Sequence, residues 1–390
     1  MGQTVNHDGD LTRVILTGSI TSANAGEFQN AIADEPGDGS GIEIDAKDLE
    51  YISSAGLRVL LAAKKRCGKK IFRIINASDD VMNVFDVTGF SEIMDITRAK
   101  RHIEIGDSQK IGAGACGEVF RLDDETIIKL YYPRIKPEEI EQEKALAKKA
   151  FVMGVPTAIS YDIVEADGRT GVVYELIKSK TLGELMREDE EHLEKYIDMY
   201  ADVCHQIHSI KSREGELPSF KDINRADIPN ITGITDEERA ALYEFLDLVP
   251  ESMHCVHGDL NINNIMVQNG ECCLIDMGEF SYGLGMFDIS RILFSMNFAA
   301  DAQHDFNSFY KMPQEKVDRI LKMLLRKYFE ADTLEEAIEK NPEAEWLYPL
   351  AWFRCCTSLL KGQKWPAEKR QQALDILHNN LLPFIAQKRG

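Results

Sequence analysis

The segment between residues 256 and 278 constrains the fold of this chain more than any other. It reads VHGDLNINNIM at 256–266 and, after an Asn-Gly pair at 269–270, CLIDMG at 273–278. An Asn-Gly pair between two short apolar runs is typical of a β-hairpin. The hairpin would place Asp259 and Asn264 before its first strand and Asp276 after its second. Two acids and an amide at one strand pair suit phosphoryl transfer, in which groups must be positioned around a highly charged phosphate.

These three side chains have distinct expected roles. Asp259 would be the catalytic residue that orients or deprotonates the attacking hydroxyl group. Four residues separate it from Asn264, so a short loop would bring the Asn264 amide oxygen to a metal ion at the same phosphoryl group. Asp276 would hold Mg²⁺ that bridges the nucleotide phosphates. We therefore expect ATP and Mg²⁺ as cofactors, and we expect His257 to brace the loop.

A glycine-rich segment at residues 111–120, IGAGACGEVF, is a candidate for covering the phosphates. Its Gly112, Gly114 and Gly117 are followed by Val119 in a strand-like run, whereas a dinucleotide-binding loop should open a helix. A turn at 123–125 and a second strand at 126–130 complete a hairpin. Glycines in such a lid let backbone N–H groups approach phosphate. A purely structural hairpin is the alternative.

Lys129 lies inside the apolar strand at 126–130, where a charge needs a partner. It would reach the α- and β-phosphates while paired with a carboxylate on a helix. A helix is predicted over 137–150, with Pro near its start and acids in its first turns. Glu143 is the favoured partner because apolar residues follow it, and Glu139 is the competitor. A solvated lysine at a strand edge is the other interpretation.

The length of 390 residues favours two domains, since a single core seldom grows beyond about 250–300 residues. The first hundred residues alternate strand-like and helix-like runs, which predicts an α/β domain with a small mixed sheet and helices over it. The expected strands are 13–18, 41–44 and 70–76, the expected helices are 23–33, 54–65 and 81–87, and 35–41 is a turn-rich loop. A bilobed α+β fold would follow. The predicted division is 1–97, a linker at 98–102, a strand-rich lobe at 103–177 and a helical lobe at 178–390, with 211–239 poor in helix.

Residues 103–390 resemble the aminoglycoside-phosphotransferase and choline-kinase branch of the protein-kinase-like superfamily. The resemblance rests on HGDLxxxN at 257–264, on DMGE at 276–279 and on FDI at 287–289, where the Asp is largely structural in that branch. It implies a kinase that transfers the γ-phosphoryl group of ATP to a hydroxyl of a small molecule. It also implies an interlobe hinge at 173–177, where Glu175 and Ile177 would be among the residues that receive adenine.

Residues 10–96 resemble STAS domains, the fold of anti-sigma-factor antagonists. The carrying runs are LTGSI at 16–20, LEYISSAGL at 49–57 and VFDVTGF at 84–90. The family usually has an acid followed by a phosphorylatable Ser. Ser53 stands in place of the acid and Ser54 aligns with the phosphorylated Ser, so both are phosphosite candidates, and either also suits a helix N-cap. The resemblance implies a protein partner of the anti-sigma-factor type.

Three functions stay open at this point. The first is a small-molecule kinase with a regulatory STAS domain. The second is a protein serine kinase that acts on Ser54 of its own STAS domain or on a partner. The third is a non-catalytic interaction protein of the anti-sigma-antagonist type.

Composition excludes some other classes. The formal net charge of −20 disfavours binding to nucleic acid. No apolar run approaches the ~20 residues of a membrane span, and the polar N-terminus predicts no signal peptide. Eight Cys without a CxxC spacing predict reduced thiols and a cytoplasmic protein. His205 and His208 are expected to pack in a helix and not to bind metal.

Overall fold

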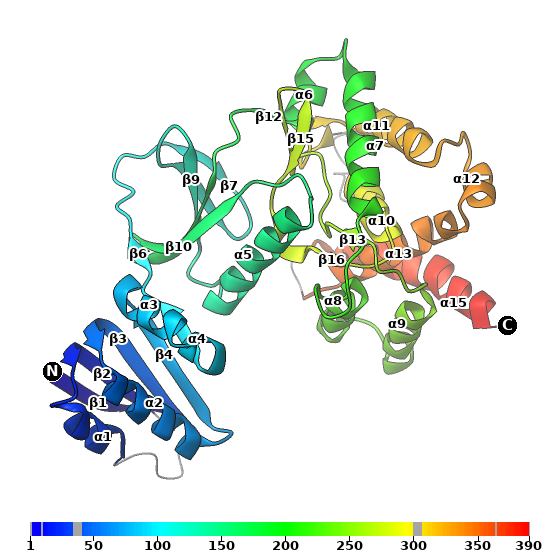
Figure 1. Cartoon of the computed structure of the whole chain (residues 1–390). Coiled ribbons are helices and arrows are strands. Elements are labelled where there is room, and N and C mark those ends of the chain that lie inside the picture. The colour runs from blue at the N-terminus through cyan, green and yellow to red at the C-terminus, as the bar shows by residue number, and fades with distance from the viewer. Residues whose placement is uncertain (1, 9–10, 34–40, 299–305, 363–364, 390) are drawn as a thin grey trace. The chain divides into compact units, whose positions relative to one another are not determined.

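The computed structural model describes residues 2–8, 11–33, 41–298, 306–362 and 365–389 (Figure 1). The chain divides into two compact units, residues 1–104 and 105–390. The loop predicted at 35–41 lies, apart from Gly41, outside the described residues.

The first unit is a five-stranded mixed sheet with helices packed on it, which confirms the predicted α/β fold. The strands run in the order β1-β2-β3-β4-β5; β1 is antiparallel to β2, and the other pairs are parallel. Alternate residues of β2 are buried at Thr12, Val14 and Leu16, so one face of the strand packs on the helices. The elements are β1 (Gly2–Asp8), β2 (Leu11–Ile20), α1 (Ala25–Ala33), β3 (Gly41–Ile52), α2 (Ser54–Cys67), β4 (Ile71–Ala77), α3 (Asp79–Val87), α4 (Phe90–Ile93) and β5 (Asp95–Arg98). The short strand β6 (Arg101–His102) follows and is not part of this sheet.

Two strands of this sheet were not predicted from the sequence pattern. β1 (GQTVNHD) and β5 (DITR) form the two edges, and neither carries the apolar alternation of a half-buried strand. Edge strands bury less surface and tolerate polar residues, which explains why the pattern is weak. The predicted linker at 98–102 contains the end of β5 and all of β6, so part of it is extended strand.

The second unit begins with an antiparallel sheet in the order β10-β11-β9-β8-β7. Helix α5 has Pro at its N-terminus and acids in its first turn, as predicted, and it buries Ile140, Leu146 and Ala150. The elements are β7 (Lys110–Ala113), β8 (Gly117–Arg121), β9 (Thr126–Tyr131), α5 (Pro137–Val152), β10 (Ser160–Ala166) and β11 (Arg169–Glu175).

The rest of the second unit is mostly helical, and its helices form a group apart from the strands β7–β11 in Figure 1. A long hydrophobic core joins its helices to the hairpin β14-β15. The elements are β12 (Lys180–Thr181), α6 (Leu182–Glu188), α7 (Leu193–Ser209), α8 (Phe220–Asp227), α9 (Asp236–Leu248), β13 (Cys255–Val256), β14 (Ile265–Gln268), β15 (Glu271–Leu274), β16 (Ser281–Tyr282), α10 (Met286–Leu293), β17 (Phe306–Asn307), β18 (Met312–Pro313), α11 (Gln314–Phe329), α12 (Leu334–Lys340), α13 (Leu347–Leu359), α14 (Ala367–Ile376) and α15 (Leu382–Arg389).

The prediction that 211–239 is poor in helix is wrong. Helix α8 and the start of α9 lie there, and each has a side-chain cap, from Ser219 and from Thr235 respectively. Pro218 precedes the Ser219 cap and Pro229 lies in a one-turn 3-10 helix between the two, so neither proline interrupts a helix interior.

Among the described residues, no helix is both long enough and apolar enough to cross a membrane.

Candidate active site

The loop between β13 and β14 carries His257, Gly258 and Asp259. The side chain of His257 is fully buried. The backbone N–H of Asp259 donates to His257 Nδ1 at 3.2 Å. Since Nδ1 accepts, Nε2 is the protonated nitrogen and donates to the carbonyl of Ile275 at 3.1 Å. The ring therefore ties the loop to the end of the neighbouring hairpin, and both of its nitrogens are occupied by backbone contacts.

Asp288 on α10 fixes the same loop from below. Its carboxylate is fully buried and accepts hydrogen bonds from the backbone N–H groups of His257 (2.8 Å) and Gly258 (2.7 Å). The ring of His208 on α7 lies 3.1 Å away. Burial opposes the charge, but His208, His257 and these hydrogen bonds outweigh it and lower the pKa of Asp288. His208 is thus part of the structural support of the loop.

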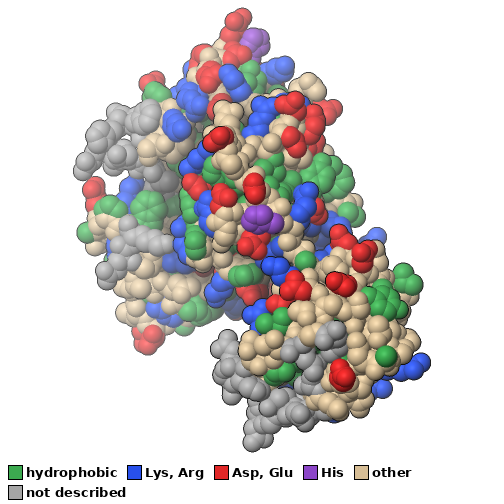
Figure 2. Space-filling model, turned by 90° about the vertical axis from the view of Figure 1, so that its left-hand side faces the viewer, with side chains coloured by type: hydrophobic (Ala, Val, Ile, Leu, Met, Phe, Trp, Pro, Cys, Tyr) green, Lys and Arg blue, Asp and Glu red, His purple; other side chains and the backbone are tan. Residues whose placement is uncertain are grey.

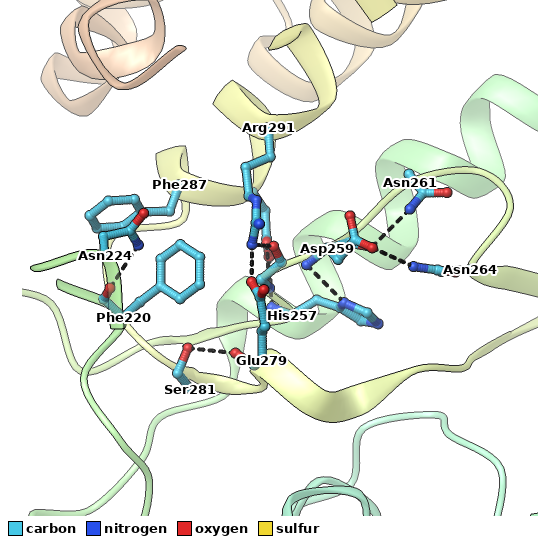
Figure 3. A network of polar contacts seen from close by, with 12 residues as sticks. Phe220, Asn224, His257, Asp259, Asn261, Asn264, Glu279, Ser281, Phe287 and Arg291 are labelled. Carbon is cyan, nitrogen blue, oxygen red and sulfur yellow. Dashed lines mark hydrogen bonds and ion pairs between the residues drawn. The ribbon is translucent and has the colours of Figure 1, made fainter. Parts of the chain in front are cut away.

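A glycine is required at position 258 because the loop makes a sharp turn there. Its φ is +85°, and a Cβ would come within 2.6 Å of the Cβ of Glu279. Glu279 also contacts the guanidinium group of Arg291, which reaches the carbonyl oxygen of Gly258 (Figure 3). Arg291 was not singled out from the sequence, although its spacing of three residues from Asp288 on a helix puts both on one face.

Asp259 and Asn264 face each other across the loop (Figure 3). The amide nitrogen of Asn264 donates to the carbonyl oxygen of Asp259 (2.9 Å) and to its carboxylate (3.1 Å). The amide nitrogen of Asn264 is thus occupied by these two hydrogen bonds, and its amide oxygen takes part in neither. The predicted hairpin follows, with Asn269 and Gly270 at φ +54° and +85°, the left-handed conformation that its two-residue turn requires.

Asp276 follows the hairpin at φ +65°, a conformation that residues other than glycine seldom adopt. The backbone N–H of Ile275 donates to the carbonyl of Asn264 at 3.0 Å, so Asn264 and Asp276 sit on adjacent backbones. The side chain of Asp276 is about half exposed. Carboxylate and amide oxygens are ligands that Mg²⁺ accepts, so this pair fits a magnesium ion that also binds phosphate oxygens. Among the described residues, no cluster of three or more Asp, Glu, His or Cys side chains could hold a metal ion.

Lys129 connects the strand-rich lobe to this site. Its Nζ lies 2.6 Å from Glu143 on α5 and 2.9 Å from Asp276. Burial opposes the charge on Lys129, but Asp276 and Glu143 outweigh it and raise the pKa of the amine. Burial likewise opposes the charge on Asp276, yet Lys129 holds the pKa of that carboxyl below its usual value. Glu139 is exposed on the same helix, so the structure selects Glu143 from the two candidate partners.

The glycine-rich segment forms the predicted hairpin. The strand register aligns Gly112, Val119 and Lys129 side by side on three adjacent strands, β7, β8 and β9. A Cβ at Gly117 would lie 2.4 Å from the carbonyl oxygen of Leu130, so close strand packing requires glycine there. A Cβ at Gly114 would meet nothing within 4 Å, so no contact within the described chain explains that glycine.

Of the predicted hinge residues, Glu175 is the last residue of β11 and Ile177 lies two residues beyond it. Glu175 donates its backbone N–H to the Ile159 carbonyl at 2.9 Å, and its carboxylate accepts the Ile159 N–H at 3.3 Å. The carbonyl of Ile177 accepts from Ser179 N–H at 2.9 Å. The Glu175 side chain therefore ties the start of the predicted hinge to Ile159.

The candidate phosphosites lie in the other unit, at the start of α2. Ser53 is buried and caps the helix, accepting the Gly56 N–H at 3.4 Å. Ser54 is exposed in the first turn. The two serines thus have different surroundings, and only Ser54 is open to solvent.

The remaining sequence candidates have structural explanations. His205 stacks on Tyr328 with ring centroids 4.6 Å apart, in the packed helix that we expected. All eight Cys are free thiols. On the face displayed in Figure 2, the described residues carry basic and acidic side chains interspersed.

Comparison with known proteins places both parts of the chain. A phosphotransferase enzyme family model (APH) matches residues 107–337, and a STAS domain model (Mlab, STAS domain) matches residues 4–96. No curated protein matches the chain.

Several solved structures are similar. The ADP-bound aminoglycoside phosphotransferase APH(2'')-Ib has 15% sequence identity and a TM-score of 0.48, covering 72% of this chain and 94% of its own. A choline/ethanolamine kinase family protein from Mesorhizobium loti has 12% identity and a TM-score of 0.45, covering 73% and 92%. An anti-sigma factor antagonist from Mycobacterium paratuberculosis has 22% identity and a TM-score of 0.24, covering 25% and 84%.

Since the APH model matches more than half of the chain, the protein belongs to the phosphotransferase enzyme family, with a STAS domain preceding its phosphotransferase domain.

Proposed function

We propose that residues 105–390 transfer the γ-phosphoryl group of ATP to a hydroxyl group of a small molecule, and that the STAS domain regulates this reaction. One observation supports the proposal most strongly. Lys129 contacts both Glu143 and Asp276, and the backbone at Asp276 lies next to that of Asn264, whose side chain contacts Asp259. A cation that would bind phosphate oxygens, side chains that would hold a metal ion and a carboxylate that would act as the base are therefore neighbours.

The strand-rich lobe would bind the nucleotide. Backbone groups around Gly112, Gly114 and Gly117 would cover the phosphates, and Val119 would pack against the base or the ribose. Lys129, held by Glu143, would bind α- and β-phosphate oxygens. The segment from Glu175 to Ile177 would receive adenine through its backbone.

Asn264 and Asp276 would hold Mg²⁺, which when bound offsets the negative charge of the phosphates. Lys129 is already close to Asp276, so the carboxylate of Asp276 would be shared between the amine and the metal.

Asp259 would accept the proton of the acceptor hydroxyl. The acceptor oxygen forms a bond to Pγ, the bond from Pγ to the β–γ bridging oxygen breaks, and ADP leaves with those electrons. Asn264 holds Asp259 by donating to its carboxylate, so the base keeps one orientation during the transfer.

The test is Asp259→Asn, assayed as ADP release with a panel of hydroxylated sugars, amino alcohols and hydroxy acids. We expect transfer to fall by about 10²–10⁴-fold, because general acid–base catalysis contributes that much. Nucleotide affinity, measured with a fluorescent ATP analogue, should stay within about twofold. Full activity of the variant would remove Asp259 from the mechanism.

A second candidate is a protein serine kinase that modifies the STAS domain. The exposure of Ser54, beside the buried cap Ser53, favours Ser54 as the acceptor in that case. Incubation of the whole protein with ATP and Mg²⁺, followed by mass mapping with Asp276→Ala as control, separates the two functions. Phosphate on Ser54 in the wild type alone would support self-modification, and unmodified protein would sink it.

A non-catalytic interaction protein is the third interpretation. It fails if the wild type transfers phosphate to any acceptor in these assays and Asp259→Asn does not.

A further inference from the structure

The tip of the glycine-rich hairpin, residues 114–117, contacts the segment between β9 and α5. The guanidinium group of Arg134, in that segment, donates to the carbonyl oxygen of Ala115. The backbone N–H of Tyr132 donates to the carbonyl of the next residue, Cys116, at 2.9 Å. The segment after β9 therefore fixes two successive carbonyl groups of the tip.

A third carbonyl is fixed within the tip, where the N–H of Gly114 donates to the carbonyl of Gly117 at 2.9 Å. The backbone N–H groups of Ala115 and Cys116 donate to no group in the described part of the chain. A trans peptide group is planar, so its N–H points away from its carbonyl. Because the Ala115 carbonyl is turned toward Arg134, the N–H of Cys116 is directed the opposite way. Backbone N–H groups left open in a loop are suited to binding an anion.

Arg134 is itself held by an aromatic ring. Its guanidinium carbon lies 4.8 Å from the ring centroid of Tyr132, which is within the range of a cation–π contact. Arg134 is exposed, and an exposed arginine side chain otherwise has many conformations. The contact with Tyr132 therefore reduces the entropy that the side chain loses when it binds the carbonyl of Ala115.

The tip lies at the end of β9 toward which Lys129, the proposed phosphate ligand, extends. Gly117 pairs with Tyr131 in the strand register. Lys129 and Tyr131 are two residues apart in β9 and so share a face of the strand. The Nζ of Lys129 lies 5.2 Å from the ring centroid of Tyr131. The side chain of Lys129 thus reaches toward the strand end at which the tip begins.

We propose that Arg134 is a positioning residue, which turns the Ala115–Cys116 peptide so that the N–H of Cys116 donates to a phosphate oxygen of the nucleotide. The proposal rests on the proposed kinase function and adds a residue to its nucleotide site. The glycines at 114 and 117 give the tip backbone freedom, and a carbonyl turned toward the phosphates would repel them. Arg134 fixes the peptide before the nucleotide binds, which lowers the entropy cost of binding.

Calorimetric titration of the full chain tests this with two ligands, a non-hydrolysable ATP analogue with Mg²⁺ and adenosine, which has no phosphate. Arg134→Gln should bind the ATP analogue about tenfold more weakly and adenosine within about twofold of the wild type, since a hydrogen bond to a charged group is lost only at the phosphates. Arg134→Lys keeps a charged donor and should recover part of the loss. Arg121→Gln is the matched control and should bind both ligands like the wild type, because Arg121 also donates to a backbone carbonyl, that of Asp123 at 3.0 Å, but at the opposite end of β8.

Amide hydrogen exchange of the nucleotide-free protein tests the contact without a ligand. The hydrogen-bonded amides of Gly114 and Tyr132 should exchange faster in Arg134→Gln and at the wild-type rate in Arg121→Gln. The melting temperature should not change, since Arg134 is exposed.

Three results would overturn the proposal: wild-type affinity of Arg134→Gln for the ATP analogue, equal losses for the analogue and adenosine, or wild-type exchange at the tip. Failure of the proposed kinase function would show separately, as a wild-type protein that does not bind the ATP analogue.

Discussion

At the scale of single residues, the two carboxylates around Lys129 are not equivalent. Glu143 is mostly buried on a helix, whereas Asp276 is about half exposed and is the expected metal ligand. Glu143 therefore holds the lysine, and Asp276 shares it. A charge partner that is buried with its cation is expensive to remove, since the cation remains without compensation.

Glu143→Gln should weaken nucleotide binding about tenfold, equal to about 1.4 kcal/mol, because Lys129 would lose the partner that aims it at the phosphates. Titration with a fluorescent ATP analogue measures this. Glu139→Gln is the matched control on the exposed side of α5 and should bind like the wild type. Equal losses in both variants would mean that the helix charge in general, and not the Lys129–Glu143 pair, supports binding.

The charges of Lys129 and Asp276 also predict a flat pH response. The pKa of Asp276 is lowered, so its charged carboxylate stabilises the folded protein fully above the usual carboxyl pKa. This stabilisation is lost only as pH falls through the lowered pKa. The pKa of Lys129 is raised, so its contribution is complete below the usual amine pKa and is lost only as pH rises through the raised value. Nucleotide affinity should therefore vary less than about twofold between pH 6 and 9, as titrations across that range would reveal. A steep change near neutral pH would contradict these shifts.

At the scale of elements, two glycines of the glycine-rich hairpin, Gly114 and Gly117, are expected to be needed for different reasons. Gly117→Ala should distort the β8–β9 pairing, because a Cβ would strike the Leu130 carbonyl. Gly114→Ala should leave the fold intact, since the space around it is open, and should still weaken nucleotide binding if backbone N–H groups approach phosphate closely. We expect lower thermal stability only in Gly117→Ala and lower nucleotide affinity in both.

Thermal melts and nucleotide titrations of the two variants decide the matter. Wild-type affinity in Gly114→Ala would show that the loop does not approach the phosphates. An unchanged melting temperature in Gly117→Ala would show that the strands can separate at that point without cost.

The elements that were predictable from sequence are those with a strong local signal. Helix α5 has its proline and acids at the start, and the β14–β15 hairpin has its Asn-Gly turn. The edge strands β1 and β5 lack alternation because they bury little. Helix α8 was missed because its two flanking prolines suggested a loop, although its Ser219 cap lies directly after the first of them.

At the scale of the whole molecule, two compact units should respond separately to a ligand. The candidate nucleotide site lies within residues 105–390, so we expect a bound ATP analogue to stabilise that unit. At a ligand concentration of 100 Kd, the gain is about 2.7 kcal/mol.

Calorimetry of the full chain should therefore give two transitions, with only one moving to higher temperature when the ATP analogue and Mg²⁺ are added. Limited proteolysis with mass mapping assigns the shifted transition to its unit. If both transitions rise together, the STAS domain is energetically coupled to the nucleotide site, and its regulatory role would act through that coupling.

The sequence by itself determined the family resemblance, the order of the two folds and the residues of the candidate site. Those depend on short motifs such as HGDLxxxN, where spacing along the chain already sets local geometry. Only the tertiary structure decided which acid pairs with Lys129, which of Ser53 and Ser54 is exposed, and that Arg291 contacts the loop that carries Asp259. These facts join residues that are distant in the chain or differ by one position on a helix. Packing alone sets such contacts, and no local periodicity encodes them.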